Sequence, residues 1–182
     1  NRKFIQADYT AVDEIKAEVQ AEKDALGLAK FNAKYTLKTL ATLETAISNS
    51  LIDYPLGRTS QDIVDGYALA IEQAYRALEP NRYNVIFIDK NGAIVRYDKD
   101  VEFESEITPP EFPKDQESYY DAENHYTYSG WDTDEYTSVI DDLVISPVYI
   151  AEAHDWDIET VSSTCVQAGT QKYTCKVGGY VK

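Results

Sequence analysis

RYNVIFIDKNGAIVRY, residues 82–97, is the stretch on which the interpretation of this sequence depends. Val85 to Ile88 form a β-branched and aromatic run, Asp89 to Gly92 are turn residues, and Ala93 to Tyr97 form a second run. This order predicts a β-hairpin. The segments before it have helical patterns, and most of those after it have strand or loop patterns.

Two turn geometries fit this hairpin, and they give different registers. A two-residue turn at Asn91-Gly92 places Ile88 opposite Val95, whereas a three-residue turn with a glycine bulge places Ile88 opposite Ile94. In both registers each face carries at least two large apolar side chains. We therefore expect both faces of the sheet to be covered.

The composition excludes several classes of function. The chain has 182 residues and a formal charge of -15, from 17 basic and 32 acidic side chains, so it repels nucleic acid and anionic lipid. Its 15 tyrosines, five phenylalanines and two tryptophans indicate a folded chain. No apolar run approaches the ~20 residues of a membrane span. Because the sequence starts at Asn1 and has no methionine, we expect a mature or excised segment of a longer protein.

The first part of the chain has a helical pattern from Lys3 to about Asp53, interrupted only by Gly27. One very long helix, or two helices joined near Gly27, both fit this pattern, with Pro55 ending it. Capping residues from Thr59 to Asp62 then predict a shorter helix that ends before Pro80. We assign residues 1–54 to a long N-terminal helix and residues 55–182 to one further module. The family resemblance described below identifies the first as a signalling and dimerisation helix and the second as a PAS-like sensor module.

The part after the hairpin begins with an acidic, proline-containing stretch, residues 100–123, which predicts a long loop. Its aromatic continuation predicts a cover laid over one face of the sheet. Residues 143–150, 158–166 and 171–181 then predict three strands. The expected fold is α+β: a five-stranded antiparallel sheet, with the long helix on one face and the aromatic loop over the other.

Cys165 and Cys175 are the only cysteines, and their spacing excludes a CxxC motif. A hairpin that turns near Thr170 places them opposite one another, which predicts a cross-strand disulfide and an oxidising compartment. Two buried free thiols are the alternative.

No catalytic motif is present in the sequence. His125 and His154, the only histidines, lie in different segments, and neither a GxSxG elbow nor a glycine-rich phosphate loop occurs. We therefore expect no enzymatic activity in this segment, no cofactor and no metal. The acidic pairs Asp132/Asp134 and Asp155/Asp157 lack the spacing of a calcium loop, so solvated acidic loops are favoured over a cation site.

The aromatic residues around Trp131 are the best candidates for a binding site. A tryptophan and several tyrosines can stack on a small molecule, and Arg96 of the hairpin can fix a polar end of it. The alternative is that the rings close the core beneath the loop. Arg96 itself needs a carboxylate, a carbonyl or an anion if it is buried.

Two stretches carry a family resemblance: FIDKNGAIVRY, residues 87–97, and GWDTDEYTSVIDDLVISPVYIAEAHDWDIETVSSTC, residues 130–165. Their order and short motifs resemble the Cache (PAS-like, PDC-type) extracytoplasmic sensor domains of prokaryotic chemoreceptors, histidine kinases and diguanylate cyclases. The resemblance covers about residues 40–181. It implies a ligand held between sheet and loop, with these contact residues: Trp131, Tyr136, Tyr149, Tyr126, Tyr128 and Arg96. Ser129 stands where amino-acid-sensing members carry an arginine, which argues against an amino-acid ligand bound in the usual way.

The resemblance implies a ligand-binding sensory domain of a membrane receptor: in the first place a histidine kinase of a two-component system, otherwise a chemoreceptor or a diguanylate cyclase. A small molecule in the pocket would shift the long helix against that of a second copy in a homodimer. Transmembrane helices would flank the segment, and the domain would lie outside the cytoplasm. The alternative is a truncated type IV pilin-like structural subunit, in which a long helix also precedes an antiparallel sheet.

Overall fold

A computed structural model describes residues 6–52 and 59–182 of the chain. It confirms a mixed α+β protein, and it divides the chain into two compact units. The first, which we call the helical unit, comprises Asn1–Tyr83, Asp100–Ser105 and Ser138–Asp141. The second, which we call the β unit, comprises Asn84–Lys99, Glu106–Thr137 and Asp142–Lys182.

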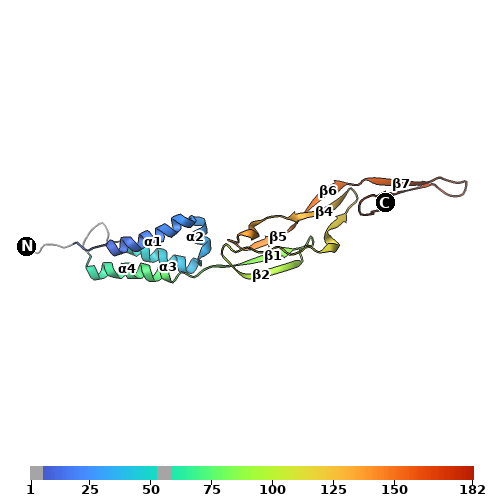
Figure 1. Cartoon of the computed structure of the whole chain (residues 1–182). Coiled ribbons are helices and arrows are strands. Elements are labelled where there is room, and N and C mark those ends of the chain that lie inside the picture. Colours follow the sequence, from blue (N-terminus) through green and yellow to red (C-terminus); the bar gives the residue numbers. More distant parts are fainter. Residues whose placement is uncertain (1–5, 53–58) are drawn as a thin grey trace, which may run out of the picture. The chain divides into compact units, whose positions relative to one another are not determined.

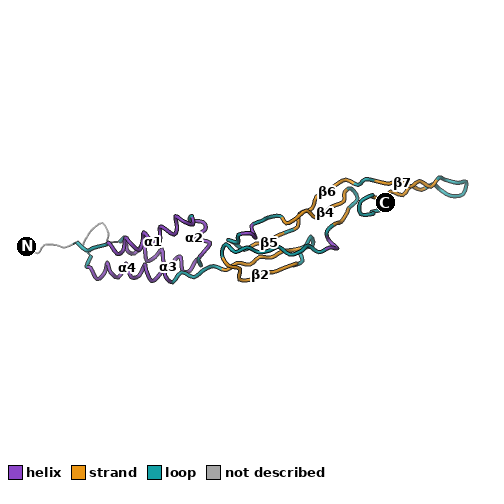
Figure 2. The backbone as a smooth tube through the Cα atoms, in the orientation of Figure 1, coloured by secondary structure: helices purple, strands orange, loops and turns teal. Residues whose placement is uncertain are grey.

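Four helices make up most of the helical unit (Figures 1 and 2): α1 Thr10–Leu26, α2 Leu28–Lys34, α3 Leu37–Ser50 and α4 Gln61–Arg76. The alternative with a break at Gly27 is confirmed, because Gly27 has φ 77° and ψ 149°, outside the helical region. A second break at Tyr35 was not predicted. Tyr35 is extended and pairs with Pro80, and the Thr36 N–H donates to Glu79 O at 2.8 Å. The predicted helix ends at Lys3, Asp53 and Pro55, and the 54/55 boundary, lie outside the described residues.

The helices bury their apolar residues against one another. The core cluster of this unit consists of Tyr9 and residues of the four helices, with Val12, Phe31, Leu43 and Ile71 fully buried. Helix α4 packs against both α1 and α3. The expectation that one long helix covers a sheet is therefore wrong. The predicted apolar stripe of the first helix is present, at Val12, Ile15 and Val19, but it packs against other helices.

One carboxylate ties three helical segments of this unit together. Glu22 of α1 accepts hydrogen bonds from Lys34 Nζ at 2.8 Å, from the Tyr35 hydroxyl at 2.7 Å and from the Tyr75 hydroxyl of α4 at 2.7 Å. Burial favours the neutral form of Glu22, but these donors outweigh it and hold its pKa below the ordinary value. The same contacts raise the pKa of Lys34 to about 12, and burial with the Glu22 contact raises that of Tyr75 to about 12.

The predicted hairpin is present as β1, Arg82–Ile88, and β2, Ile94–Glu102. Its turn is the three-residue alternative, since the Gly92 N–H donates to Asp89 O at 3.0 Å, the Asp89 N–H donates to Ala93 O at 2.8 Å, and Gly92 has φ 83°. The Asp89 carboxylate is buried and accepts the N–H groups of Asn91 and Ala93. It also accepts the Gln116 amide, and together these donors hold its pKa below the ordinary value.

The expectation of a single five-stranded antiparallel sheet is wrong. β1 lies between β2 and β5, Leu143–Ile145, and it pairs with β5 in parallel, with Phe87 opposite Ile145. A parallel pair needs a long crossover connection, which here is formed by the residues between β1 and β5, with β2 among them. Only one face of β1 is buried, at Val85 and Phe87, whereas Ile86 and Ile88 on the other face are half-buried.

Part of the segment expected to be loop forms a second sheet. It contains β3, Ser118–Tyr120, β4, Asn124–Trp131, and β6, Pro147–Ala153, all antiparallel with β4 in the centre. Two short 3-10 turns, Lys114–Gln116 and Glu135–Thr137, flank it. The side chains of β4 therefore have positions fixed by two neighbouring strands, which a covering loop would not provide.

The last two strands form a separate hairpin, β7, Trp156–Val161, and β8, Thr170–Cys175. The predicted disulfide is wrong, because both cysteines are free thiols. Cys175 is buried opposite Trp156, while Cys165 is exposed in the loop between the strands. The hairpin turns before Thr170 rather than at it, so the cysteines are not cross-strand partners. The oxidising compartment loses this support.

Candidate functional site

The aromatic residues that the sequence singled out lie in one continuous set of ring contacts within the β unit. We call this set the aromatic cluster; it consists of Phe87, Phe112, Tyr119, Tyr126, Tyr128, Trp131, Tyr136 and Tyr149. Its members come from β1, β3, β4, β6 and the segments between the strands. Five of the six predicted ligand contacts, all except Arg96, thus belong to one set of touching rings, and their binding of a ligand stays a prediction.

Phe112 is at the centre of the aromatic cluster and is a residue that sequence reasoning missed. Its ring is stacked on that of Tyr128, with centroids 4.2 Å apart and planes inclined by 7°. It also meets Trp131 edge-on at 5.5 Å and Tyr149 at 6.2 Å. At 7% exposure it is buried, as is Val101 at the start of the acidic segment. The signal available in the sequence was one large apolar residue between Pro110 and Pro113, too little to assign it to a core.

The remaining members extend this packing in two directions. Phe87 contacts Trp131 at 5.0 Å and Tyr136 at 5.7 Å, which joins the first sheet to β4. Tyr119 stacks on Tyr126 at 4.5 Å. Offset and edge-on ring pairs at these distances each contribute about 0.5–1.5 kcal/mol beyond their buried area.

Hydroxyl groups at the margin of the aromatic cluster have protein partners. Tyr149 donates to the carbonyl of Gln116 at 2.8 Å, and Tyr126 donates to Asp121 Oδ2 at 2.9 Å. Burial raises the pKa of Tyr149 and that of Tyr128, and the Asp121 contact raises that of Tyr126. These tyrosines therefore stay neutral well above neutral pH, and two of their polar ends fasten neighbouring segments.

Arg96 is not a member of the aromatic cluster. Its guanidinium donates to Asp98 Oδ1, from Nη2 at 2.8 Å and Nε at 3.1 Å, and to the carbonyl of Thr108, from Nη1 at 2.9 Å. The Arg96 side chain is 40% exposed rather than buried, and it has both a carboxylate and a carbonyl as acceptors. Arg96 thus ties β2 to Thr108 of the acidic segment. All three of its guanidinium nitrogens donate to acceptors within the protein.

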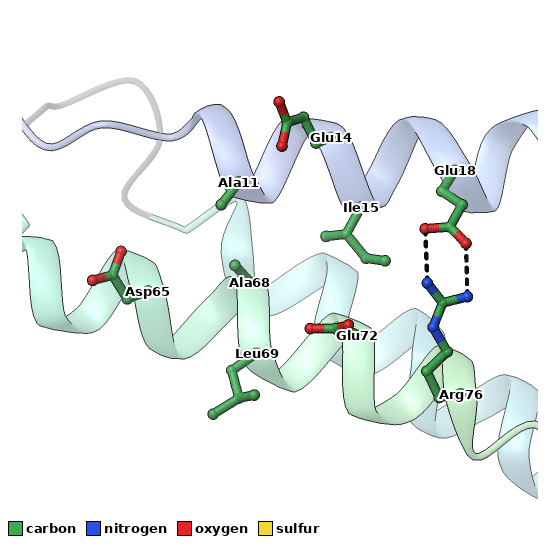
Figure 3. A pocket seen from close by; sticks show the side chains of 9 residues that line it. All are labelled: Ala11, Glu14, Ile15, Glu18, Asp65, Ala68, Leu69, Glu72 and Arg76. Atoms are coloured by element: carbon green, nitrogen blue, oxygen red, sulfur yellow. Dashed lines mark hydrogen bonds and ion pairs between the residues drawn. The ribbon is translucent and has the colours of Figure 1, made fainter.

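Two surface grooves lie along α4 in the helical unit. The first, of about 490 Å³, runs between α1 and α4 and is shown in Figure 3. Small and apolar side chains alternate there with the carboxylates of Glu14, Asp65 and Glu72, while Glu18 is held by Arg76 in two hydrogen bonds of 2.7 and 3.0 Å. The second, of about 640 Å³, lies between α3 and α4 and is lined by alanine, threonine, asparagine and glutamine. Neither groove contains a residue predicted to bind a ligand.

Three of the four carboxylates considered as cation ligands, those of Asp132, Asp155 and Asp157, have protein partners. Asp132 accepts the Ser146 N–H at 3.0 Å. Lys176 Nζ lies 2.9 Å from Asp155 Oδ2 and 3.9 Å from Asp157 Oδ1. No group of three or more metal-ligating side chains occurs among residues 6–52 and 59–182. Of the two alternatives, these contacts favour ordinary acidic loops.

In the part of the chain that the structure describes, no helix has the length and apolar character needed to cross a bilayer. The chain matches no family model, no curated protein and no solved structure in the comparisons made.

Proposed function

We propose that this chain is a non-enzymatic structural module of an extracytoplasmic protein, and that its aromatic residues serve its folding rather than the capture of a small molecule. The observation that carries the proposal is the packing of Phe112. Its ring occupies the place between Tyr128, Trp131 and Tyr149 where the predicted ligand would lie.

The polar contacts of the β unit support the same function. Arg96 is bonded to Asp98 and Thr108, Asp89 to Gln116, and Tyr149 to the Gln116 carbonyl. Apart from the Arg96–Asp98 pair, which lies within β2, these bonds tie Thr108 and Gln116 of the acidic segment to β2, to β6 and to the turn after β1. A long segment fixed at several points suits a module that must keep its shape.

Like the pilin-like subunit considered from the sequence, the proposed module has a structural role, but it does not have the architecture of a pilin. A pilin-like subunit requires one long helix, whereas the longest helix of the described residues, α1, spans 17 residues. The extracytoplasmic compartment remains part of the proposal. It is supported by the resemblance to extracytoplasmic domains, and it does not depend on a disulfide.

A second candidate function is the ligand-sensing domain implied by the Cache resemblance. The observation in its favour is that Trp131, Tyr128 and Tyr149 meet, as the resemblance requires, and each is only half-buried. A ligand would then have to displace Phe112. The homodimer through the N-terminal helix and the flanking membrane spans stay predictions of this second candidate.

Two variants of Trp131 distinguish the candidates. For a structural module, Trp131→Ala lowers stability, Trp131→Phe retains most of it, and no small metabolite raises the unfolding temperature of the wild-type protein. A ligand at one hundred times its Kd would add about 2.7 kcal/mol, which a thermal-shift screen detects. A metabolite that stabilises the wild type but not a stable Trp131→Phe variant would overturn the structural proposal in favour of sensing.

A further inference from the structure

The β7–β8 hairpin is the least covered element of the β unit. Ile158 and Val161 of β7 are 57% and 60% exposed, and every residue from Asp157 to Lys172 is exposed. A two-stranded hairpin with both faces in water is marginally stable, whereas a third strand normally supplies what it lacks. Such a strand could pair with the outer edge of β7 or with that of β8.

The edge of β8 is partly occupied by the chain itself. The N–H and C=O of Tyr173 exchange two hydrogen bonds of 3.0 Å with Lys182, and the Cys175 N–H donates to Tyr180 O at 2.7 Å. The backbone groups of Tyr173 therefore point away from β7. Residues 180–182 act as a short third strand on this side.

The opposite edge, that of β7, is open. Ile158 lies opposite Tyr173, so its N–H and C=O also point away from the partner strand, and those of Thr160, two residues on, do the same. Among the described residues no hydrogen bond satisfies these four groups. β7 contains no proline, and no bulge interrupts its pairing with β8. It therefore lacks two of the features that protect edge strands.

The charges along β7 specify what can pair there. Asp157 and Glu159 flank Ile158, Glu159 is opposite Lys172, and the Asp157 side chain is 73% exposed. β8 supplies one basic side chain to this face, Lys172, and a strand with lysine or arginine at alternate positions would place cations beside both Asp157 and Glu159. A second β7 paired in antiparallel, centred on Ile158 or Glu159, would put carboxylates opposite one another, between chains of charge -15.

We propose that the open edge of β7 binds, by β-strand addition, an extended segment of another protein in which basic residues alternate with β-branched ones. Main-chain hydrogen bonds to Ile158 and Thr160 supply the affinity, and Asp157 and Glu159 supply the preference for basic side chains. This inference concerns a surface outside the aromatic cluster and does not depend on the function proposed for that cluster.

The test uses the full chain and the synthetic peptide KVKVKVK, with EVEVEVE as the charge control. Fluorescence of Trp156 or anisotropy of a labelled peptide reports binding, and amide exchange measured by NMR reports protection at Ile158 and Thr160. We expect KVKVKVK to bind with an affinity that falls as salt rises, to protect both amides, and to exceed EVEVEVE at least tenfold.

Thr160→Pro removes an outward N–H without removing a bond to β8, so it should weaken binding at least tenfold. Gln171→Pro is the matched control, since Gln171 is opposite Thr160 and its N–H points to the other edge. If Thr160→Pro unfolds the hairpin, Glu159→Lys replaces it, and it should reverse the preference between the two peptides. Three outcomes would overturn the proposal: no binding of KVKVKVK, equal binding by wild type and a folded Thr160→Pro variant, or self-association of the wild type that Thr160→Pro abolishes.

Discussion

The helical unit and the β unit fill their cores in different ways. The helical unit buries aliphatic side chains completely, including Val12, Leu43 and Ile71. The β unit has few fully buried side chains and relies on half-buried rings, such as Trp131 and Tyr149, that are held by one another and by their polar ends. The stability of the aliphatic core depends on how completely its side chains fill the space. The stability of the aromatic core depends also on the orientation of each ring.

Under the structural function proposed above, this difference explains why aromatic residues are a poor guide to a binding site in this chain. Their amphipathic rings allow a small sheet to be packed while the hydroxyl groups remain at its margin, bonded to loop carbonyls and carboxylates. The same composition would line a ligand pocket. Only the position of Phe112 distinguishes the two uses.

The largest effect is expected from the aliphatic type of core. Phe31→Ala in α2 removes a fully buried ring and should lower the stability of the helical unit by about 3–5 kcal/mol. Circular dichroism at 222 nm during urea unfolding measures it, since all four helices lie in this unit. Leu28→Ala in the same helix is the control, because Leu28 is 64% exposed and should cost less than about 0.5 kcal/mol. Equal losses would show that α2 does not bury Phe31.

The matching change in the β unit is Phe112→Ala. It leaves a void between three rings, and we expect a loss of about 3 kcal/mol, detected by tryptophan fluorescence because both tryptophans lie in this unit. Ile150→Ala on β6, at 56% exposure, should change little. A Phe112→Ala variant as stable as the wild type would mean that Phe112 is a lid over an open site, which is the sensor interpretation.

A smaller effect is expected at the polar contact that joins α1 to α4. Glu22→Gln keeps the shape of the side chain but removes the charge that Lys34 and two tyrosine hydroxyls share, so the helical unit should lose about 1–2 kcal/mol. Glu18→Gln breaks only the exposed pair with Arg76 and should cost at most about 1 kcal/mol. A Glu18 effect as large as that of Glu22 would refute this ranking.

The same cluster sets the pH dependence of the helical unit. The pKa of Glu22 is below its ordinary value of 4.5, so this carboxylate stabilises the fold above pH 4.5, and its contribution is lost as pH falls through the lowered folded pKa. Lys34 and Tyr75 have pKa values raised to about 12, from 10.5 and 10.0, so their contributions are complete below pH 10 and disappear as pH rises to about 12. Urea midpoints at 222 nm should therefore fall at both extremes. Glu22→Gln should flatten both falls.

The smallest expected effect is that of reductant. Because Cys165 and Cys175 are apart in the hairpin, dithiothreitol should leave the stability of both units unchanged, and mass spectrometry after non-reducing denaturation should find two free thiols. A mass lower by two hydrogens would restore the disulfide and, with it, the argument for an oxidising compartment.

Local patterns predicted local structure correctly in this sequence. The turn residues Asn91 and Gly92 identified the hairpin, and the caps before α4 and the stripe containing Val64 and Ile71 identified that helix. The pairing of strands distant in sequence was not predictable in this way, because a short apolar run such as Leu143–Ile145 fits a parallel or an antiparallel partner equally.

The candidate site was predicted in part of its membership: Trp131, Tyr128 and Tyr149 belong to the aromatic cluster, whereas Arg96 does not and Phe112 was missed. Tyr126 and Tyr128 alternate with His125 and Thr127, which is a strand pattern that we interpreted as loop because of the acidic residues before it. Once β4 is a central strand, its rings are positioned by two neighbours. The break at Tyr35 likewise depends on a partner, Pro80, that lies far along the chain.

The most direct test of this account is the urea unfolding of Trp131→Ala beside the wild type, followed at once by the fluorescence of Trp156 and by circular dichroism at 222 nm. Trp131 belongs to the aromatic core of the β unit, and the helices belong to the other unit. We predict that the fluorescence midpoint falls, by about 2–3 kcal/mol of stability, while the helical transition stays in place. An unchanged fluorescence midpoint would contradict a structural role for the aromatic cluster, and an equal fall in both signals would contradict two separate cores.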